Sequence, residues 1–215
     1  MNFELDELLA NQPTWLKCSD CGQETMRSRC WECEKRLDEA DEAVLRAQEA
    51  RERFDACRLP QAYMWAALKS RELQKAVVYR RPVEELAKRI LESTKVILAG
   101  PTGVGKTAVT VACLRARAPR CLFVSATELS TFGEEKDALR QRALATPLLL
   151  LDDLGQDSSN ACSDIVHILM QRHNSGRDTW ITTGLSVSQI QARYGDGVWR
   201  RWVKEARQFS LGEDS

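Results

Sequence analysis

The sequence has no long hydrophobic run and no excess of charge of either sign. No stretch approaches the roughly 18 consecutive apolar residues of a membrane-spanning helix. The acidic beginning, MNFELDELLA, has neither the basic nor the apolar part of a signal peptide. Lysine plus arginine and aspartate plus glutamate number 31 each, so no net charge draws the chain to nucleic acid. We therefore expect a cytoplasmic protein that binds no membrane and contacts nucleic acid only through a local patch.

Internal repeats and low-complexity segments are also missing, and histidine occurs only twice in 215 residues. Hydrophobic residues make up 43% and charged residues 29%, which is typical of a chain with a true core. The length accommodates one medium α/β domain and a small additional module. Cysteine is more abundant, with eight residues. In a reducing compartment these favour metal binding or buried thiols over disulfides.

Short apolar runs alternate with helical patterns over most of the chain. The runs that are typical of buried parallel strands lie at 95–99, 121–125, 148–151 and 179–183. Helices are expected at 34–58, 63–76, 82–93, 107–117, within 127–145, and at 163–173. This alternation predicts an α/β fold in which helices cover both faces of a mainly parallel sheet.

A glycine-rich motif, GPTGVGKT at 100–107, lies between the first expected strand and the next helix. Gly103 and Gly105 let successive N–H groups point at phosphate oxygens, and the helix start adds partial positive charge. Lys106 should reach the β- and γ-phosphates, and the Thr107 hydroxyl should take one Mg²⁺ position. The expected nucleotide-binding residues are Gly100, Pro101, Thr102, Gly103, Val104, Gly105, Lys106, Thr107 and Ala108.

Two acids, Asp152 and Asp153, follow the four leucines at 148–151. Because parallel strands end at the same edge of a sheet, both acids are expected beside the phosphate loop. Asp152 is then the Mg²⁺-side carboxylate, and Asp153 orients or deprotonates the attacking water. The alternative is that the two acids only begin a surface turn.

Two cysteine pairs, Cys18 with Cys21 and Cys30 with Cys33, are separated by eight residues. Each pair can present two thiolates from one tight turn, and two pairs complete a tetrahedral Zn²⁺ site. A redox-active pair and four unrelated thiols are the alternatives. The sequence therefore predicts a zinc-binding module at 1–36, a helical linker at 37–58 and an ATPase domain at 59–215.

From about residue 59 to 209 the chain resembles the DnaC/IstB-type AAA+ ATPases. LLLLDDLG is similar to the second nucleotide motif of that family, and Leu59 and Pro60 with Tyr63 are similar to its leading segment. Residues 165–186 resemble its helix, turn and sensor-1 strand, and residues 194–202 the segment that carries an arginine finger. The resemblance implies a P-loop NTPase (AAA+) sandwich that hydrolyses ATP. It also implies an ATP-bridged oligomer, in which Arg201, or the adjacent Arg200, enters a neighbouring subunit's site.

The chain departs from the family pattern at sensor 1. The polar residue of relatives falls at Gly184 here, which leaves Thr182 or Thr183 to substitute; Thr183 is the expected nucleotide contact. Hydrolysis is then expected to be slow, or the site acts as an ATP-binding switch. Arg172 is either a site residue by resemblance or an ordinary surface arginine.

The resemblance also implies partners. A helicase loader would bind a DnaB-type replicative helicase and single-stranded DNA. Its docking face would be the zinc module with an amphipathic start at Phe3, Leu5, Leu8 and Leu9. An IstB-like transposition helper and an ATP-bound adaptor with little hydrolysis are the alternatives, and a nucleic-acid-binding zinc ribbon is the rival role for the module. Three tryptophans lie in the C-terminal third, namely Trp180, Trp199 and Trp202. Trp199 and Trp202, three apart on an expected helix, serve core packing, a subunit contact or base stacking.

Overall fold

The computed structural model describes residues 15–130 and 134–212. The chain divides into two compact units, Met1–Glu52 and Arg53–Ser215. The expected amphipathic start, with Phe3 and Leu5, lies outside the described residues. Within the described residues, the helices are all too short or too polar to cross a bilayer.

The N-terminal unit is a small hairpin followed by a long helix. Strands β1 (Leu16–Lys17) and β2 (Glu24–Thr25) pair antiparallel, and helix α2 (Trp31–Asp55) follows. Among the described residues of this unit, the only buried ones are three cysteines, namely Cys18, Cys30 and Cys33. So few buried side chains cannot stabilise a fold by hydrophobic burial alone, so a further source of stability is needed.

The second unit is built on five parallel strands in the order β4-β5-β6-β3-β7. The strands are β3 (Lys95–Ala99), β4 (Cys121–Ser125), β5 (Leu148–Leu154), β6 (Asp178–Thr183) and β7 (Arg207–Ser210). The four expected strands are confirmed. Strand β7 was not expected, because at this sheet edge only Phe209 is buried and the sequence there shows no apolar run.

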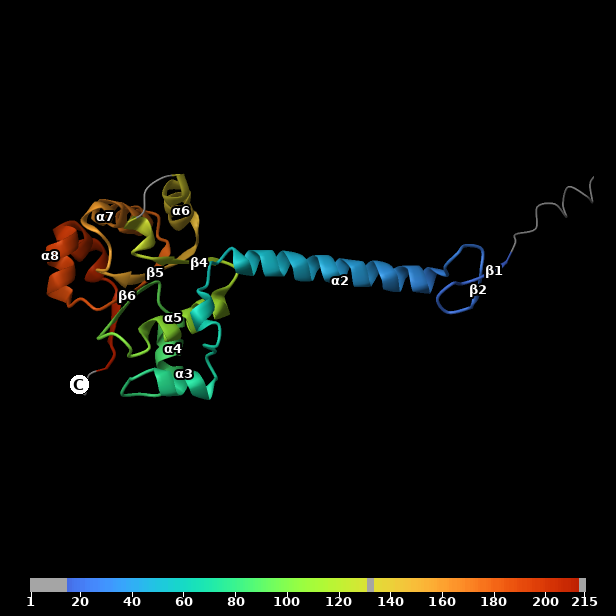
Figure 1. Ribbon diagram of the computed structural model, residues 1–215, viewed down its shortest axis with the longest axis horizontal. Helices are drawn as coiled ribbons and strands as arrows, with labels where there is room; N and C mark the ends of the chain where they lie inside the picture. The colour runs from blue at the N-terminus through green and yellow to red at the C-terminus, as the bar shows by residue number, and fades with distance from the viewer. Residues whose placement is uncertain (1–14, 131–133, 213–215) are drawn as a thin grey trace, which may run out of the picture. The chain divides into compact units, whose positions relative to one another are not determined.

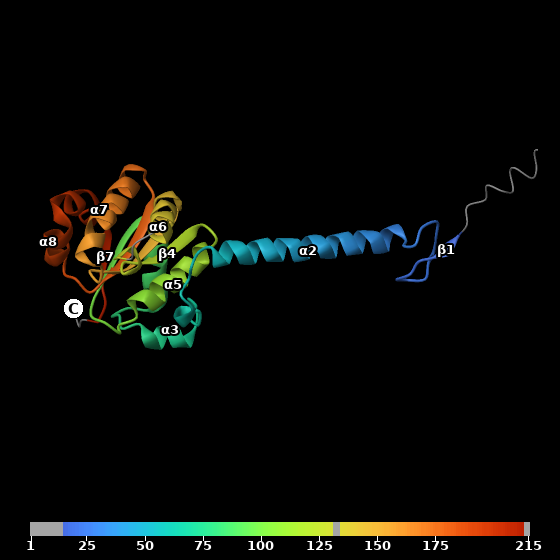
Figure 2. The ribbon, with the colours of Figure 1, turned by 45° about the horizontal axis from the view of Figure 1, so that its top comes forward.

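Helices cover both faces of this sheet (Figure 1), which confirms the expected αβα sandwich. One face carries α3 (Arg71–Ala76), α4 (Val83–Leu91) and α5 (Lys106–Arg117). The other carries α6 (Glu134–Ala145), α7 (Ser159–Asn174) and α8 (Val187–Val198). Figure 2 shows α5 and α7 on opposite sides of the sheet. Trp180 and Trp202 are buried in these two layers, so they pack in the core and are not available for base stacking.

The expectation of one continuous helix at 63–76 is wrong. The structure has a single turn, η1 (Gln61–Tyr63), and then the short α3. Arg115 of α5 donates two 2.7 Å hydrogen bonds, to the carbonyl oxygens of Met64 and Ala66. Ser70 then caps α3 by accepting from the backbone N–H of Leu73. Carbonyl groups that a helix would use internally are therefore bound by a neighbouring helix instead.

Both expectations for Arg172 are wrong, because its side chain is fully buried. Its guanidinium donates to the carbonyl oxygens of Ala143 (2.6 Å) and Thr146 (2.8 Å) and to the hydroxyl of Thr179 (2.9 Å). These partners lie near the N-terminal ends of β5 and β6, whereas the phosphate loop lies at the C-terminal ends of the strands. Burial lowers the pKa of Arg172 to about 10. The residue joins α6, α7 and the two strands and takes no part in a surface or a catalytic site.

Candidate functional site

The phosphate loop follows β3 and its shape depends on two glycines with left-handed backbone angles. Gly103 and Gly105 both have φ of 86°, a conformation that glycine adopts without steric cost. A side chain at Gly105 would also meet the carbonyl oxygen of Ala76 at 2.5 Å. The backbone N–H of Val78 donates to the Val104 carbonyl (3.1 Å), so the segment before α4 closes against the loop. α5 begins directly after Gly105, which directs its N-terminal N–H groups into the loop.

Lys106 is 6% exposed although it carries a charge. Its Nζ atom donates to the carbonyl oxygens of Gly100 and Pro101, both at 2.8 Å. Burial lowers the pKa of Lys106, and the charges of Asp153 and Asp152 oppose that shift. A nearly buried ammonium beside backbone N–H groups makes a site for a polyanion.

The Thr107 hydroxyl and the Asp152 carboxylate are in direct contact. Thr107 Oγ1 donates to Asp152 Oδ1 at 2.9 Å, and Thr182 Oγ1 donates to the same oxygen at 2.5 Å. Burial raises the pKa of Asp152, while both hydroxyl hydrogen bonds lower it. Oxygen atoms of a hydroxyl and a carboxylate beside a phosphate site are the ligands that Mg²⁺ prefers. The donor set therefore fits this ion.

Asp153 lies on a break in strand β5. The pairing of β5 with β6 shifts register between Leu151 and Leu154, and Asp153 has a φ of 54°. Its backbone N–H donates to Thr182 Oγ1 (2.9 Å). Asp152 is therefore buried and Asp153 exposed, although both follow the same apolar run. A left-handed conformation is rare for a residue with a side chain. The hydrogen bond from the Asp153 N–H to Thr182 stabilises it here.

The Thr183 hydroxyl is engaged by backbone groups near the end of its own strand. It donates to the Leu154 carbonyl (2.6 Å) and accepts from the Leu185 N–H (3.0 Å). Thr182, and not Thr183, is the β6 threonine that contacts Asp152. Gly184 has space for a side chain, since an added Cβ would meet only Gly100 O at 3.9 Å.

A cavity of about 570 Å³ opens over the phosphate loop. Its walls come from the loop, from the ends of β4 and β5 and from the segment before α3. The lining residues are Tyr63, Trp65, Ala76, Thr102, Gly103, Gly105, Lys106, Thr107, Ala108, Ser125, Thr127, Asp153 and Gln156. Sequence reasoning missed Ser125, Thr127 and Gln156 as site residues. Their position just after expected strands could have identified them, whereas nothing in the sequence distinguishes Trp65.

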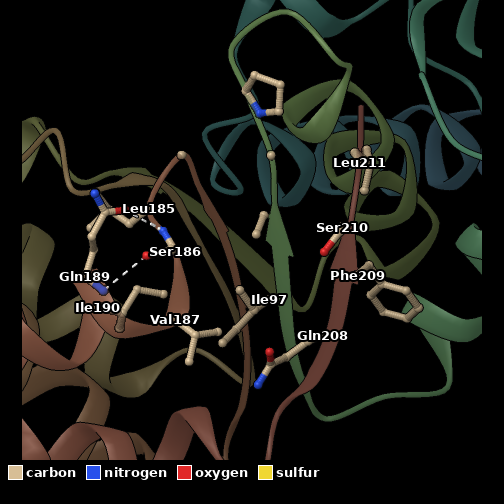
Figure 3. A pocket seen from close by; sticks show the side chains of 14 residues that line it. Ile97, Leu185, Ser186, Val187, Gln189, Ile190, Gln208, Phe209, Ser210 and Leu211 are labelled. Carbon is tan, nitrogen blue, oxygen red and sulfur yellow. Dashed lines mark hydrogen bonds between the residues drawn. The ribbon is translucent and has the colours of Figure 1, made fainter. Parts of the chain in front are cut away.

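A second cavity, of about 530 Å³, lies between the ends of β3, β6 and β7 and the start of α8 (Figure 3). Ile97 and Val187 line its apolar part, and Gly184 lies in its wall. Ser186 and Gln189 form a reciprocal cap at the start of α8. Gly184 thus lines this second cavity and does not line the one over the phosphate loop.

Arg201 lies in the single π-helical turn η3 (Trp199–Val203) and is exposed. Lys95 Nζ donates to its carbonyl oxygen at 3.4 Å, while the guanidinium does not line the phosphate cavity of its own chain. Arg200 is equally exposed. Both side chains are therefore accessible to another molecule.

The four cysteines of the N-terminal unit come together. Their Sγ atoms lie within 4.8 Å of one another, and those of Cys21 and Cys30 are 3.6 Å apart. Thiolates on one tetrahedral zinc ion are separated by about 3.8 Å, because each Zn–S bond is about 2.3 Å long. The cluster, comprising Cys18, Cys21, Cys30 and Cys33, therefore fits a zinc ion.

Hydrogen bonds and burial act in opposite directions on the thiols of this cluster. The backbone N–H of Cys30 donates to Cys18 Sγ (3.3 Å), and such backbone donors, from Cys30 first, lower the pKa of Cys18 to about 6. The Arg36 guanidinium donates to Cys33 Sγ at 2.9 Å, although burial raises the pKa of Cys33 to about 12. Donors to sulfur of this kind orient the ligands of a metal site.

Comparison with known proteins places this geometry in a family. No curated protein matches the chain. Among solved structures, the crystal structure of the DnaC helicase loader is similar with 22% identity and a TM-score of 0.56, over 71% of this chain and 100% of that chain. The DnaI crystal structure is similar with 20% identity and a TM-score of 0.51, over 68% and 96%. AMPPCP-bound DnaA from Aquifex aeolicus is similar with 19% identity and a TM-score of 0.54, over 73% and 52%.

These likenesses show a shared fold. The family described as IstB-like ATP binding protein matches residues 4–202, a range that includes the cysteine cluster, the phosphate loop and both acids. This match confirms the expected DnaC/IstB-type resemblance. The chain belongs to the family of IstB-like ATP-binding proteins.

Proposed function

We propose that this protein binds ATP with Mg²⁺ over the phosphate loop and hydrolyses it to ADP and phosphate. The observation that carries the proposal is the buried contact between Thr107 and Asp152 (2.9 Å), directly after the nearly buried Lys106. Loop N–H groups and Lys106 would bind the β- and γ-phosphates, and Thr107 and Asp152 would hold Mg²⁺. The ion, when bound, neutralises charge that develops on the phosphate oxygens.

Asp153 is the proposed base. It is exposed to the cavity that Lys106 and Thr107 line, and its backbone is fixed by Thr182. From this place its carboxylate can orient the attacking water and take a proton from it as the water oxygen bonds to the terminal phosphorus. Arg201, which lies outside its own chain's cavity, would stabilise the terminal phosphate of a neighbouring copy. The proposal therefore includes self-association into an ATP-bridged oligomer.

The partner proposed is a DnaB-type replicative helicase, to be loaded on single-stranded DNA. Support comes from the residues that resemble helicase loaders and from the fold shared with DnaC and DnaI. The zinc module is the proposed docking head. It carries exposed apolar side chains, namely Trp15, Leu16, Met26 and Trp31, of the kind that protein interfaces use.

A second candidate is a transposition helper that binds target DNA and a transposase. The observation in its favour is the family match itself, which begins at residue 4 and so includes the N-terminal unit. A third reading, an ATP-bound adaptor with little hydrolysis, is favoured by Gly184, which stands where the resemblance places the polar sensor-1 residue.

Two measurements test these readings. The first is capture of the replicative helicase by the full chain, with and without ATP, compared with C18S/C21S protein and with zinc content measured for both. Capture by zinc-loaded protein that is lost in the double variant supports the loader. Absence of capture by folded, zinc-loaded protein excludes it and favours the transposition helper. The second is phosphate release with and without single-stranded DNA; ATP binding without turnover in both conditions leaves the adaptor.

A further inference from the structure

Among the described residues that line the phosphate cavity, none comes from strand β6. Strand β6 lies between β3 and β5, so its end borders both the phosphate loop and the two acids. Thr182 is bonded to Asp152 and Asp153, and Thr183 to Leu154 and Leu185. Gly184 has no side chain. The end of β6 therefore presents no free side-chain donor to this cavity.

Gln156 is the amide side chain in the wall of this cavity. It is exposed, and its amide makes no hydrogen bond to any residue that the structure describes. A glutamine amide has two donors and one acceptor oxygen. It lines this cavity together with Asp153, the residue proposed to act on the terminal phosphate. Its uncommitted donors are therefore available to a phosphate oxygen.

The backbone that carries Gln156 is held on both sides. Its N–H donates to the Asp153 carbonyl (3.0 Å). Gly155, with φ of 106°, packs so closely on Leu185 that an added Cβ would lie 2.7 Å from that side chain. A donor presented from a fixed turn loses less conformational entropy when it binds than one on a mobile loop.

The next residue, Asp157, anchors the turn to α8. Its carboxylate is buried and accepts from the Gly155 N–H (3.0 Å), from the Tyr194 hydroxyl and from the Arg193 guanidinium (3.1 Å). The turn at 155–157 is thus tied to the sheet at one end and to a helix at the other. Only the side chain of Gln156 stays free to move toward a ligand.

The other hydroxyl groups of this wall are less suited to the role. Ser125 and Thr127 are bonded to each other through their side-chain oxygens at 2.8 Å, so one of the two hydroxyl protons is already used. Thr102 belongs to the phosphate loop itself. Gln156 has the longest reach of these groups and the larger number of free donors.

We propose that the side-chain amide of Gln156 donates a hydrogen bond to the terminal phosphate of bound ATP, and thereby distinguishes ATP from ADP. This proposal rests on the proposed ATP site. The hydrogen bond to the terminal phosphate would then come from the turn after β5, since the end of β6 has no free side chain to donate it. ADP has no phosphate at this place, so the contact should affect the affinity for the triphosphate alone.

The test is equilibrium binding of ADP and of AMPPCP, a non-hydrolysable ATP analogue, to full-length protein with Mg²⁺. Q156A should bind AMPPCP about tenfold more weakly than wild type, because a hydrogen bond to a charged group has about that effect on an equilibrium constant. Its affinity for ADP should not change. Q156E should lose more AMPPCP affinity than Q156A, since a carboxylate would face the phosphate. Q171A, at an exposed glutamine of α7, is the matched control.

The outcomes separate this inference from the proposed function. If wild-type protein binds both nucleotides and Q156A keeps the wild-type ratio of the two affinities, the role of Gln156 is refuted while the ATP site stands. An equal loss for ADP and AMPPCP in Q156A also refutes it, because it indicates a general change of the turn. If wild-type protein binds neither nucleotide, the proposed ATP site fails and this inference fails with it. Thermal melts of each variant verify that the fold is intact.

Discussion

Thr182 holds both acids at the end of β5 through a single hydroxyl group. Its Oγ1 atom donates to Asp152 Oδ1 (2.5 Å) and accepts from the backbone N–H of Asp153 (2.9 Å). The Thr182 side chain is fully buried, and its hydrogen bond to the Asp152 carboxylate is buried as well. One residue of β6 therefore fixes the Mg²⁺-side carboxylate and the backbone of the proposed base together.

Replacing Thr182 with valine should loosen both acids while keeping the shape of the core. We expect the free energy of unfolding to fall by about 1–3 kcal/mol, since the variant removes one of the two hydroxyl donors to Asp152 Oδ1 and the acceptor of the Asp153 N–H. Phosphate release should fall more than ADP affinity, because the loop itself is unchanged. Urea denaturation and ADP titration measure the two effects. Thr182→Ser, which keeps the hydroxyl, is the control and should resemble wild type.

Asp152→Asn should make the protein more stable at neutral pH and remove its Mg²⁺-dependent function. Burial raises the pKa of Asp152 above its ordinary value of 3.8, so the native state resists ionisation that the unfolded chain undergoes freely. This carboxyl therefore favours folding below pH 3.8, and its contribution is lost as the pH rises from there through the raised pKa. A neutral amide avoids that loss.

Thermal melts across pH check this sign. Asp152→Asn should melt higher than wild type at pH 7, and the difference should shrink as the pH falls through the raised pKa of Asp152 and the wild-type carboxyl takes up its proton. Addition of ATP and Mg²⁺ should stabilise only the wild type. A variant that melts lower than wild type at pH 7 would show that the hydroxyl hydrogen bonds outweigh burial of the charge.

Gly105→Ala should be much more damaging than Gly103→Ala, although both glycines have the same φ of 86°. At Gly105 an added Cβ would lie 2.5 Å from the Ala76 carbonyl oxygen, whereas at Gly103 nothing lies within 4 Å. Gly103→Ala should therefore show only the left-handed strain of about 1–3 kcal/mol, and Gly105→Ala that strain plus displacement of the 76–78 segment. Chemical denaturation and ADP binding of the pair provide the comparison. Equal losses of stability and ADP affinity in the two variants would mean that the backbone at Ala76 can move aside at little cost.

Arg172→Ala should destabilise the ATPase unit without acting on the site. The guanidinium hydrogen bonds link α6, β5 and β6, and their loss leaves buried carbonyl groups unpaired at about 1–3 kcal/mol each. The free energy of unfolding should fall by at least about 3 kcal/mol. Protein that remains folded at low temperature should bind ADP as wild type does. A drop in ADP affinity in folded protein would instead indicate coupling between the two ends of the sheet.

The phosphate loop, the order of strands and helices and the cysteine pairs could be predicted because each depends on local pattern. Glycines at 103 and 105 are required by backbone geometry, and the leucines before Asp152 identify a buried strand. Strand β7 and the broken helix at 63–76 could not be predicted, because one is a polar edge strand and the other is held by Arg115 from α5. Local preference is overridden where a distant side chain binds the backbone.

The sequence by itself determined which chemical groups the chain carries, since the lysine, threonine, acids and cysteines occur at spacings that predict phosphate and metal binding. Only the tertiary structure decided how that chemistry is distributed. It separated Asp152 from Asp153 through an irregularity in β5, chose Thr182 over Thr183, buried Arg172 and brought Gln156 into the phosphate cavity. The reason is physical, because burial and hydrogen-bond partners depend on which distant elements pack together, and spacing along one chain does not record that.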